Sequence, residues 1–254
     1  MSFPLYAHAE TSMGFFLGDT SIRLQNNTTK KIRESKSRFF LFGLSTHCNE
    51  TMISTGNYKT FTIEFKPNGF NRIFGIVAHE VADNILSANE VIGHEVVSLY
   101  EQLQEARNAL EIVSLSDSFL INCVSRAKQV YVNEGITRIC SQLMTSNSTS
   151  IAQYAYQANM SMRNFERIFK AQVGTSPKLF YRLLRFNAAL NFKIKNPAVS
   201  WTDVVYEFNY YDSMHLIKEF KNFTNSSPTV LLNSNPDFVE NGCYKIHALK
   251  PADI

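Results

Sequence analysis

Two stretches of this 254-residue chain repeat one another, and the duplication limits the folds open to its C-terminal half. Residues 151–181 align with residues 202–232 at an offset of 51. The Phe-Lys pair at 169–170 recurs at 220–221, and the Ser-Pro pair at 176–177 recurs at 227–228. Each copy has the pattern of a short helix, a tight turn, a second helix and a Ser-Pro step. One structural unit is therefore expected to occur twice.

The turn residues have the chemistry that a helix-turn-helix unit needs. Asn159 and Asn209 stand where the first helix of each copy ends. Asparagine adopts the left-handed conformation more readily than other non-glycine residues. Ser161 and Asp212 follow as N-caps of the second helices. One such pattern is a weak signal, but two matching copies predict two helix-turn-helix units.

A single long helix is predicted between the two units. Pro177 suits the first turn of a helix that continues to Lys195, a stretch of 19 residues. At 1.5 Å per residue its length is about 28 Å. Successive major-groove segments on one face of DNA lie about 34 Å apart. One chain could thus set both second helices into neighbouring grooves, with some bending of the duplex.

The second helix of such a unit can enter the major groove, so its exposed face carries the candidate contacts. Four polar residues of the first copy recur at i, i+3, i+4 and i+7 and share one face. Arginine suits guanine edges, glutamate accepts from cytosine, and lysine suits phosphate. The candidate DNA-binding residues are Arg163, Asn164, Glu166, Arg167 and Lys170 in the first copy and Ser213, Met214, His215, Lys218 and Lys221 in the second.

The two copies are expected to contribute unequally. On the second helix only Lys218 and Lys221 suit phosphate, while Met214 and Ile217 can pack on thymine methyl groups. The first copy is therefore expected to read more sequence, and the second to anchor the DNA backbone. Two alternatives stay open at this point. The polar face can be simply solvated, and His215 can be a partly packed histidine on the helix surface.

Charge and composition set the broad class. Residues 147–234 carry 10 basic and 5 acidic side chains, against 13 and 14 in residues 1–146 and 2 and 3 in residues 235–254. A basic segment of this kind suits a polyanion partner. Apolar residues make up 44% of the chain and no run of about 18 apolar residues occurs, so a folded chain that does not cross a membrane is expected. The start lacks a secretory signal, and the four cysteines are scattered without a C-x-x-C pair, so a cytoplasmic location is expected.

The N-terminal half is predicted to combine short antiparallel strands with helices. Alternation of Phe61, Ile63 and Phe65 with polar residues is typical of a half-buried strand. A turn is predicted at Pro67-Asn68-Gly69. The predicted strands are 15–17, 38–45 and 59–65, and the predicted helices are 70–76, 81–86, one from Ile92 with Val96, Leu99, Leu103 and Leu110 at helical spacing, and one over 117–132.

Residues 151–232 resemble the DNA-binding module of AraC/XylS-type transcriptional regulators. The resemblance rests on Ile-Ala-Gln-Tyr-Ala, Asn-Met-Ser-Met-Arg-Asn-Phe-Glu-Arg-Ile-Phe-Lys and Gly-Thr-Ser-Pro in the first copy, and on Trp-Thr-Asp-Val-Val, Phe-Lys and Ser-Ser-Pro in the second. With the preceding helix from about Asn133 it covers roughly 100 residues. The sequence departs from the family pattern at Asn159 and Asn209, where glycine is usual, and at Val205, where alanine is usual. The Ser-Pro step of the second copy is preceded by Asn225, where the first copy has Gly174.

The resemblance implies a transcription regulator, and an activator rather than a repressor. It implies double-stranded DNA and RNA polymerase as partners, a small β-rich N-terminal domain for sensing a small-molecule effector or forming a homodimer, and neither enzyme activity nor a cofactor. The residues following Phe61 resemble the strand–turn–helix of such N-terminal domains. The expected fold is an α+β N-terminal domain, a small antiparallel sheet or barrel with helices, followed by an all-α domain with two helix-turn-helix units. The expected boundaries are 1–130, 133–234 and a tail at 235–254.

Two other classes of function stay open. A cupin-like metal-dependent enzyme would need clustered ligands, but His47, His79 and His94 occur without an H-x-H pair or an H-E-x-x-H motif. The chain can also be a ligand-binding or adaptor protein whose helical half binds protein instead of DNA. Stoichiometric metal would favour the first of these, and DNA affinity that falls with salt would exclude the second.

Overall fold

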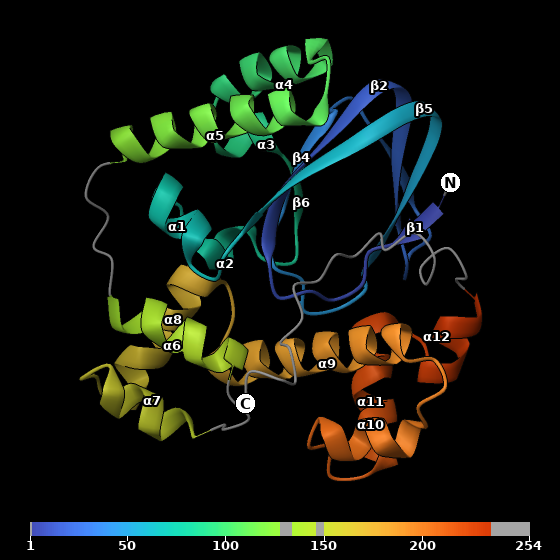
Figure 1. Ribbon diagram of the computed structural model, residues 1–254, viewed down its shortest axis with the longest axis vertical. Helices are drawn as coiled ribbons and strands as arrows, with labels where there is room; N and C mark the ends of the chain where they lie inside the picture. The colour runs from blue at the N-terminus through green and yellow to red at the C-terminus, as the bar shows by residue number, and fades with distance from the viewer. Residues whose placement is uncertain (1, 128–133, 146–149, 235–254) are drawn as a thin grey trace.

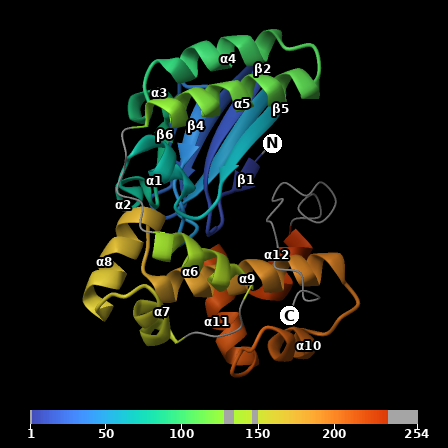
Figure 2. The same cartoon turned by 60° about the vertical axis from the view of Figure 1, so that its left-hand side comes forward.

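The protein consists of an N-terminal antiparallel sheet with helices and a C-terminal array of helices (Figure 1). The computed structural model describes residues 2–127, 134–145 and 150–234. The sheet lies on one side of the long helix α9 (Pro177–Lys195), and the helical units lie at the two ends of that helix (Figures 1 and 2). The predicted fold class, an α+β domain followed by an all-α domain with two joined helix-turn-helix units, is confirmed.

The sheet is built on two long strands, β2 (Thr11–Asn26) and β5 (Glu50–Phe65). They pair antiparallel along their whole length, from Thr11 opposite Phe65 to Asn26 opposite Glu50. The strand order is β1-β5-β2-β4-β6, and β3 pairs with β2 beside this path. The short strands are β1 (Ser2–Pro4), β3 (Ile32–Ser35), β4 (Phe39–Phe42) and β6 (Ile85–Ser87).

The predicted strands at 15–17 and 59–65 are confirmed as strands, but these strands are longer in the structure than predicted. Phe61, Ile63 and Phe65 of β5 are partly or fully buried, and the residues between them are exposed, as expected. Their strand begins at Glu50, because the polar residues in its first half pair with β2 and need no apolar alternation to do so. The turn prediction at Asn68 is confirmed, since this residue has a φ of 59° in the left-handed region.

Helices of the N-terminal half differ from prediction in three places. Helix α1 (Gly69–Phe74) agrees, but α2 (Ala78–Val81) ends where a helix over 81–86 was predicted, and strand β6 follows. Two helices follow, α3 (Ala88–Val91) and α4 (Glu95–Glu105). The chain then breaks, and Asn108 caps α5 (Ala109–Arg126) by accepting from the Glu111 amide at 3.0 Å.

That break corrects the prediction for the helix from Ile92. Val96, Leu99 and Leu103 are buried on α4 as expected, whereas Leu110 belongs to α5 and is 82% exposed. The spacing from Leu103 to Leu110 is helical, but the extended conformation of Ala106 ends α4 before Leu110 is reached. Helix α5 also begins earlier than the predicted 117–132, and residues 128–133 lie outside the described residues.

The C-terminal half is helical throughout its described part, as predicted. The pairs α7–α8 and α10–α11 flank α9, and Figures 1 and 2 show them at opposite ends of it. Helix α9 spans the 19 residues that the sequence predicted, with Pro177 in its first turn. The remaining bounds are α6 (Glu134–Thr145), α7 (Ile151–Gln157), α8 (Met162–Val173), α10 (Trp201–Glu207), α11 (Ser213–Thr224) and α12 (Pro228–Ser234).

The cores show how the two halves meet. One apolar cluster lies between the sheet and α4, and it includes Phe15, Leu41 and Val96. A second fills the helical half and extends into the N-terminal half through Tyr6, Ala7, Ala9, Leu44 and Cys48.

Division into domains at 130 and 133 remains a proposal, because that boundary and the tail at 235–254 lie outside the described residues. Within the described ranges, no helix combines the length and apolar content that crossing a membrane requires.

Candidate nucleic-acid interface

Both turns have the conformation that their asparagines predicted. Asn159 has a φ of 54° and Asn209 a φ of 52°, both in the left-handed region. The Ser161 hydroxyl then accepts from the Asn164 amide at 3.3 Å, and the Asp212 carboxylate accepts from the His215 amide at 2.6 Å. These side chains satisfy amides that are otherwise free in the first turn of α8 and of α11. Each unit is therefore a helix-turn-helix with a capped second helix.

The repeat is not at one constant offset, which corrects the alignment made from sequence. Helices α7 and α10 begin at 151 and 201, an offset of 50, whereas α8 and α11 begin at 162 and 213, an offset of 51. The additional residue lies in the second turn, where Tyr211 is 90% exposed. An exposed side chain at a turn can be inserted without disturbing the core, so Phe169 and Phe220 keep equivalent buried places in the two units.

Helix α8 presents the predicted polar face to solvent. Phe165 and Phe169 are fully buried and pack against each other, and Phe169 also packs against Phe180 of α9. The predicted contact residues lie on the opposite side: Arg163, Glu166, Arg167 and Lys170 are exposed and Asn164 is partly exposed. The Arg167 guanidinium donates to the Asn164 side-chain carbonyl at 2.9 Å. The N-terminal half therefore leaves these arginines accessible.

Helix α11 presents a weaker polar face. Ser213, Met214, Lys218 and Lys221 are exposed, Met214 to 70%. His215 is placed differently. Its side chain is partly buried, its ring stacks edge-on against Tyr210, and its Nε2 lies 3.7 Å from a carboxylate oxygen of Glu219. The structure thus brings nine of the ten predicted residues to the two outer faces and turns the His215 ring toward α9.

A buried ion cluster behind α11 was missed by the sequence reasoning. Glu219 is 1% exposed, and its Oε1 accepts from Arg182 Nε at 2.7 Å and from Arg185 Nη2 at 2.8 Å. Both arginines come from α9, so the cluster ties α11 to the helix that joins the units. The Arg185 guanidinium also lies 4.2 Å from the centre of the Tyr210 ring. Burial, and next the nearby Glu219 carboxylate, raises the pKa of the Tyr210 hydroxyl.

The repeat itself contained the signal for Glu219. At the offset of 51 this residue aligns with Ile168, which packs against the core of the first unit. A carboxylate on the inward face of a helix requires a positive partner, because an unpaired buried charge is too costly to keep. Arg182 and Arg185 on the predicted long helix were the available partners. Comparison of the inward faces, and not only of the outer ones, would have found the cluster.

The structure gives no support to a metal site in the part of the chain that it describes. No group of three or more histidine, cysteine, aspartate or glutamate side chains is arranged to hold a metal ion there. Of the histidines considered from sequence, His47 has its Nδ1 3.4 Å from a carboxylate oxygen of Asp83. Two such groups are fewer than the three or more ligands that a protein metal site needs.

Fold and geometry together define a protein with two helix-turn-helix units joined by one long helix. Comparison with known families agrees, since residues 154–234 match the family described as "Helix-turn-helix domain". These residues form a helix-turn-helix domain, and the resemblance of this part of the chain to the AraC/XylS-type module is confirmed.

A curated relative with a similar sequence points the same way. The chain is 30% identical over 151 residues to an "Uncharacterized HTH-type transcriptional regulator" of Haemophilus influenzae; the match covers 54% of this chain and 50% of that relative. The chain thus spans half the length of the curated relative that it matches.

Among solved structures, ToxT from Vibrio cholerae O395 is similar with a TM-score of 0.46 at 12% identity, over 91% of this chain and 92% of that one. Wild-type ToxT of strain SCE256, bound to an unsaturated fatty acid, has a TM-score of 0.48 at 13% identity, over 91% and 89%.

Proposed function

We propose that this protein is a sequence-specific DNA-binding transcription regulator that inserts α8 and α11 into adjacent major-groove segments. The observation that supports this most is the exposure of polar faces on both second helices, each preceded by a capped, left-handed turn. Arg163, Glu166 and Arg167 read base edges, Lys170 contacts phosphate, and Asn164 supports Arg167. Ser213, Lys218 and Lys221 hold the DNA backbone, and Met214 packs on a thymine methyl group.

The role of His215 is narrower in this proposal. Its Nδ1 faces the Tyr211 amide at 3.4 Å, and its Nε2 faces Arg185 and Glu219. A ring held in this way orients the start of α11, and it reaches a phosphate only if that internal arrangement loosens. Among the predicted contacts of α11, the lysines therefore carry most of the electrostatic attraction to the duplex.

Salt dependence of duplex binding tests the proposal. Neutralising phosphates releases counterions, so the logarithm of affinity should fall linearly with the logarithm of salt concentration. Lys221→Ala should weaken binding to all sequences alike and reduce that slope by about 0.9, the contribution of one phosphate. Lys59→Ala, which removes an exposed lysine of β5, is the matched control and should leave the slope unchanged. An affinity indifferent to salt would instead favour the adaptor alternative.

A homodimer formed through α5 is part of the proposal. Four aliphatic side chains on the outer face of this helix are exposed: Leu110 (82%), Val113 (48%), Ile121 (66%) and Val124 (56%). Together with exposed Asp117 they follow one another at spacings of 3, 4, 4 and 3 residues and form one stripe. The stripe is symmetric about Asp117, as a two-fold interface between antiparallel copies of α5 requires. Such pairing places Leu110 opposite Val124 and Val113 opposite Ile121 of the second copy.

Substitutions in this stripe test the dimer. Ile121→Glu is expected to weaken self-association about tenfold or more, because pairing would then bury an uncompensated charge. Asp117→Asn is expected to strengthen it by removing two like charges that meet on the two-fold axis. Sedimentation equilibrium measures both, with Gln102→Glu on α4 as the control. A chain that is monomeric at all concentrations, or a dimer that tolerates Ile121→Glu, would exclude this interface.

The remaining parts of the proposal follow from the resemblance to AraC/XylS-type regulators. Activation through contact with RNA polymerase is proposed in preference to repression, and the sheet with α1 to α5 is proposed to sense a small-molecule effector. Enzyme activity is not proposed. A reporter gene placed behind a selected binding site distinguishes activation from repression by the sign of the change in expression.

A further inference from the structure

One loop of the N-terminal half contacts both helix-turn-helix units. The bridging loop, residues 44–49, connects β4 to β5. Gly174 ends α8 and Asn225 ends α11, and the two occupy equivalent places in the repeat at an offset of 51. Both have left-handed conformations, with φ of 109° and 59°. Each of these helix ends meets the bridging loop or the segment that supports it.

The first unit meets this region by close packing. A Cβ atom placed on Gly174 would lie 3.7 Å from Leu44 Cβ, 3.6 Å from Ala82 Cβ and 3.5 Å from the Ala78 carbonyl oxygen. Helix α8 therefore ends against both the bridging loop and α2. A second contact holds the same end, where the Asn68 side-chain amide donates to the Gln172 side-chain carbonyl of α8 at 3.5 Å and to the Thr137 hydroxyl of α6 at 2.9 Å.

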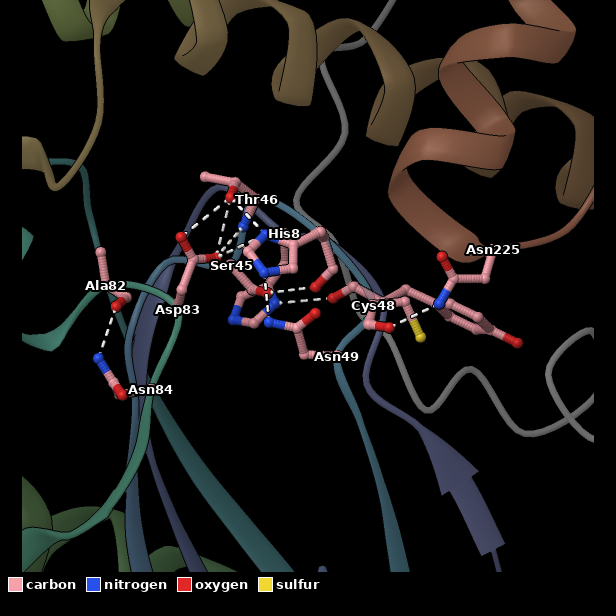
Figure 3. A network of polar contacts seen from close by, with 11 residues as sticks. His8, Ser45, Thr46, Cys48, Asn49, Ala82, Asp83, Asn84 and Asn225 are labelled. Atoms are coloured by element: carbon pink, nitrogen blue, oxygen red, sulfur yellow. Dashed lines mark hydrogen bonds and ion pairs between the residues drawn. The ribbon is translucent and has the colours of Figure 1, made fainter. Parts of the chain in front are cut away.

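The second unit meets the loop through a hydrogen bond. The Asn225 side-chain amide donates to the Cys48 carbonyl at 2.7 Å, a contact drawn in Figure 3. The Asn27 side chain donates to the same carbonyl at 3.1 Å, so this oxygen is held from both sides. Two residues earlier, in the last turn of α11, the Phe223 carbonyl accepts from the Ala7 amide at 3.0 Å. The end of α11 is thus fixed to the N-terminal half at two points.

The loop is held in shape by Asp83, which follows α2 with a left-handed φ of 58°. Its carboxylate accepts from the Thr46 amide at 2.6 Å and from the Thr46 hydroxyl at 2.9 Å (Figure 3). Its own amide donates to the Leu44 carbonyl at 2.8 Å. Gly43 approaches α2 so closely that a Cβ there would lie 1.8 Å from the Val81 carbonyl oxygen. The two contact points on the loop, Leu44 and Cys48, are therefore parts of one rigid segment.

We propose that the bridging loop sets the spacing between the two DNA segments that the protein reads, with Asn225 and Asp83 as positioning residues. This inference rests on the proposed function. Each unit packs on its own end of α9, through Phe169 on Phe180 and through Phe220 on Phe186, so α9 couples the two units along one line only. The bridging loop supplies a second connection, from the end of α8 to the end of α11. Two connections at separate points fix both distance and orientation, which reduces the entropy lost when both helices enter their grooves together.

Glycine substitutions test this without straining the backbone. Asn225 and Asp83 both have left-handed backbone conformations, which glycine adopts freely. Asn225→Gly and Asp83→Gly therefore remove side-chain contacts without changing the backbone. Asn159→Gly is the matched control, because its φ of 54° lies in the same region and its place in the first turn is away from the loop. The full chain is measured on duplexes carrying a site selected from random DNA, and on duplexes with one base pair added or removed between the two contacted segments.

Wild type and Asn159→Gly are expected to prefer the selected spacing strongly. Asn225→Gly and Asp83→Gly should discriminate about 2- to 12-fold less between spacings, as for the loss of one net hydrogen bond. Variants that keep the wild-type discrimination would overturn the inference. So would variants that lose affinity equally at every spacing, since that indicates lower stability and not altered positioning. Absence of binding by the wild-type chain would overturn the proposed function, and this inference with it.

Discussion

Replacing Glu219 by alanine is expected to lower the free energy of unfolding by about 3 to 5 kcal/mol. The substitution leaves the guanidinium of Arg185, which is mostly buried, without its carboxylate, and it removes the link at 2.7 Å to Arg182. The cost of an unpaired charge in the interior exceeds what the pair itself contributes. Because both arginines belong to α9, the effect should be felt first in the packing of α11 against that helix.

Trp201 provides the measurement. It is the only tryptophan of the chain, and its ring lies 5.5 Å from that of Phe220 on α11. Its fluorescence during urea unfolding therefore reports on the second unit. Glu219→Gln, which keeps the shape and removes the charge, should fall between wild type and alanine. Glu207→Ala, at an exposed acidic residue of α10, should change stability by less than about 0.5 kcal/mol. A similarly small effect for Glu219→Ala would show that the cluster does not hold the unit together.

Arg163→Ala and Arg167→Ala are each expected to cost about 1 to 3 kcal/mol of binding at the preferred site, which is a loss of about 5- to 150-fold in affinity. Both side chains are exposed on α8, so their removal should leave folding stability nearly unchanged. Arginine forms paired hydrogen bonds to guanine, and its loss should therefore also relax the sequence preference at the base pairs contacted.

Competition between the preferred site and unrelated DNA measures this loss of preference. Lys178→Ala is a suitable control, because it removes an exposed positive charge at the start of α9 and not on α8. It should shift affinity for both DNAs alike or leave both unchanged. Arginine variants that bind the preferred site as wild type does would show that α8 presents a different face to DNA.

Local chemistry allowed the helical half to be predicted closely from sequence. Left-handed asparagines at 159 and 209, the caps at Ser161 and Asp212, and the span of α9 with Pro177 in its first turn all agree with the structure. Each depends on residues within a few positions of one another, and a duplicated pattern provides an internal check. The single residue added at Tyr211 is hidden because the strongest matches, the Phe-Lys and Ser-Pro pairs, all follow the turn and share the offset of 51.

The N-terminal half was harder because its structure depends on distant pairing. The first half of β5 is polar, and it becomes a strand because β2 supplies its hydrogen bonds. Helical spacing from Val96 to Leu110 continued across the break between α4 and α5, so Leu110 was assigned to a buried face that it does not share. Its exposure is what reveals the stripe on α5.

Sequence reasoning identified the outer faces of the candidate site but not what supports them. Arg163, Arg167, Lys218 and Lys221 were identified, because charge and helical spacing are visible in the sequence. The contact from Asn225 to Cys48 joins residues 177 positions apart, and no local pattern indicates it. Glu219 lies between these cases, since only comparison with the equivalent Ile168 marks it as a charge in a buried place.

Selection of bound duplexes from a random DNA pool by the full chain tests the central claim most directly. If α8 and α11 enter successive major-groove segments, the recovered sequences will share two short conserved segments whose centres lie about 10 base pairs apart. The segment read by α8 will be the more strongly conserved, since its face carries the arginines. Recovery of one conserved segment only, or of duplexes without any shared sequence, would contradict reading of DNA by two joined units.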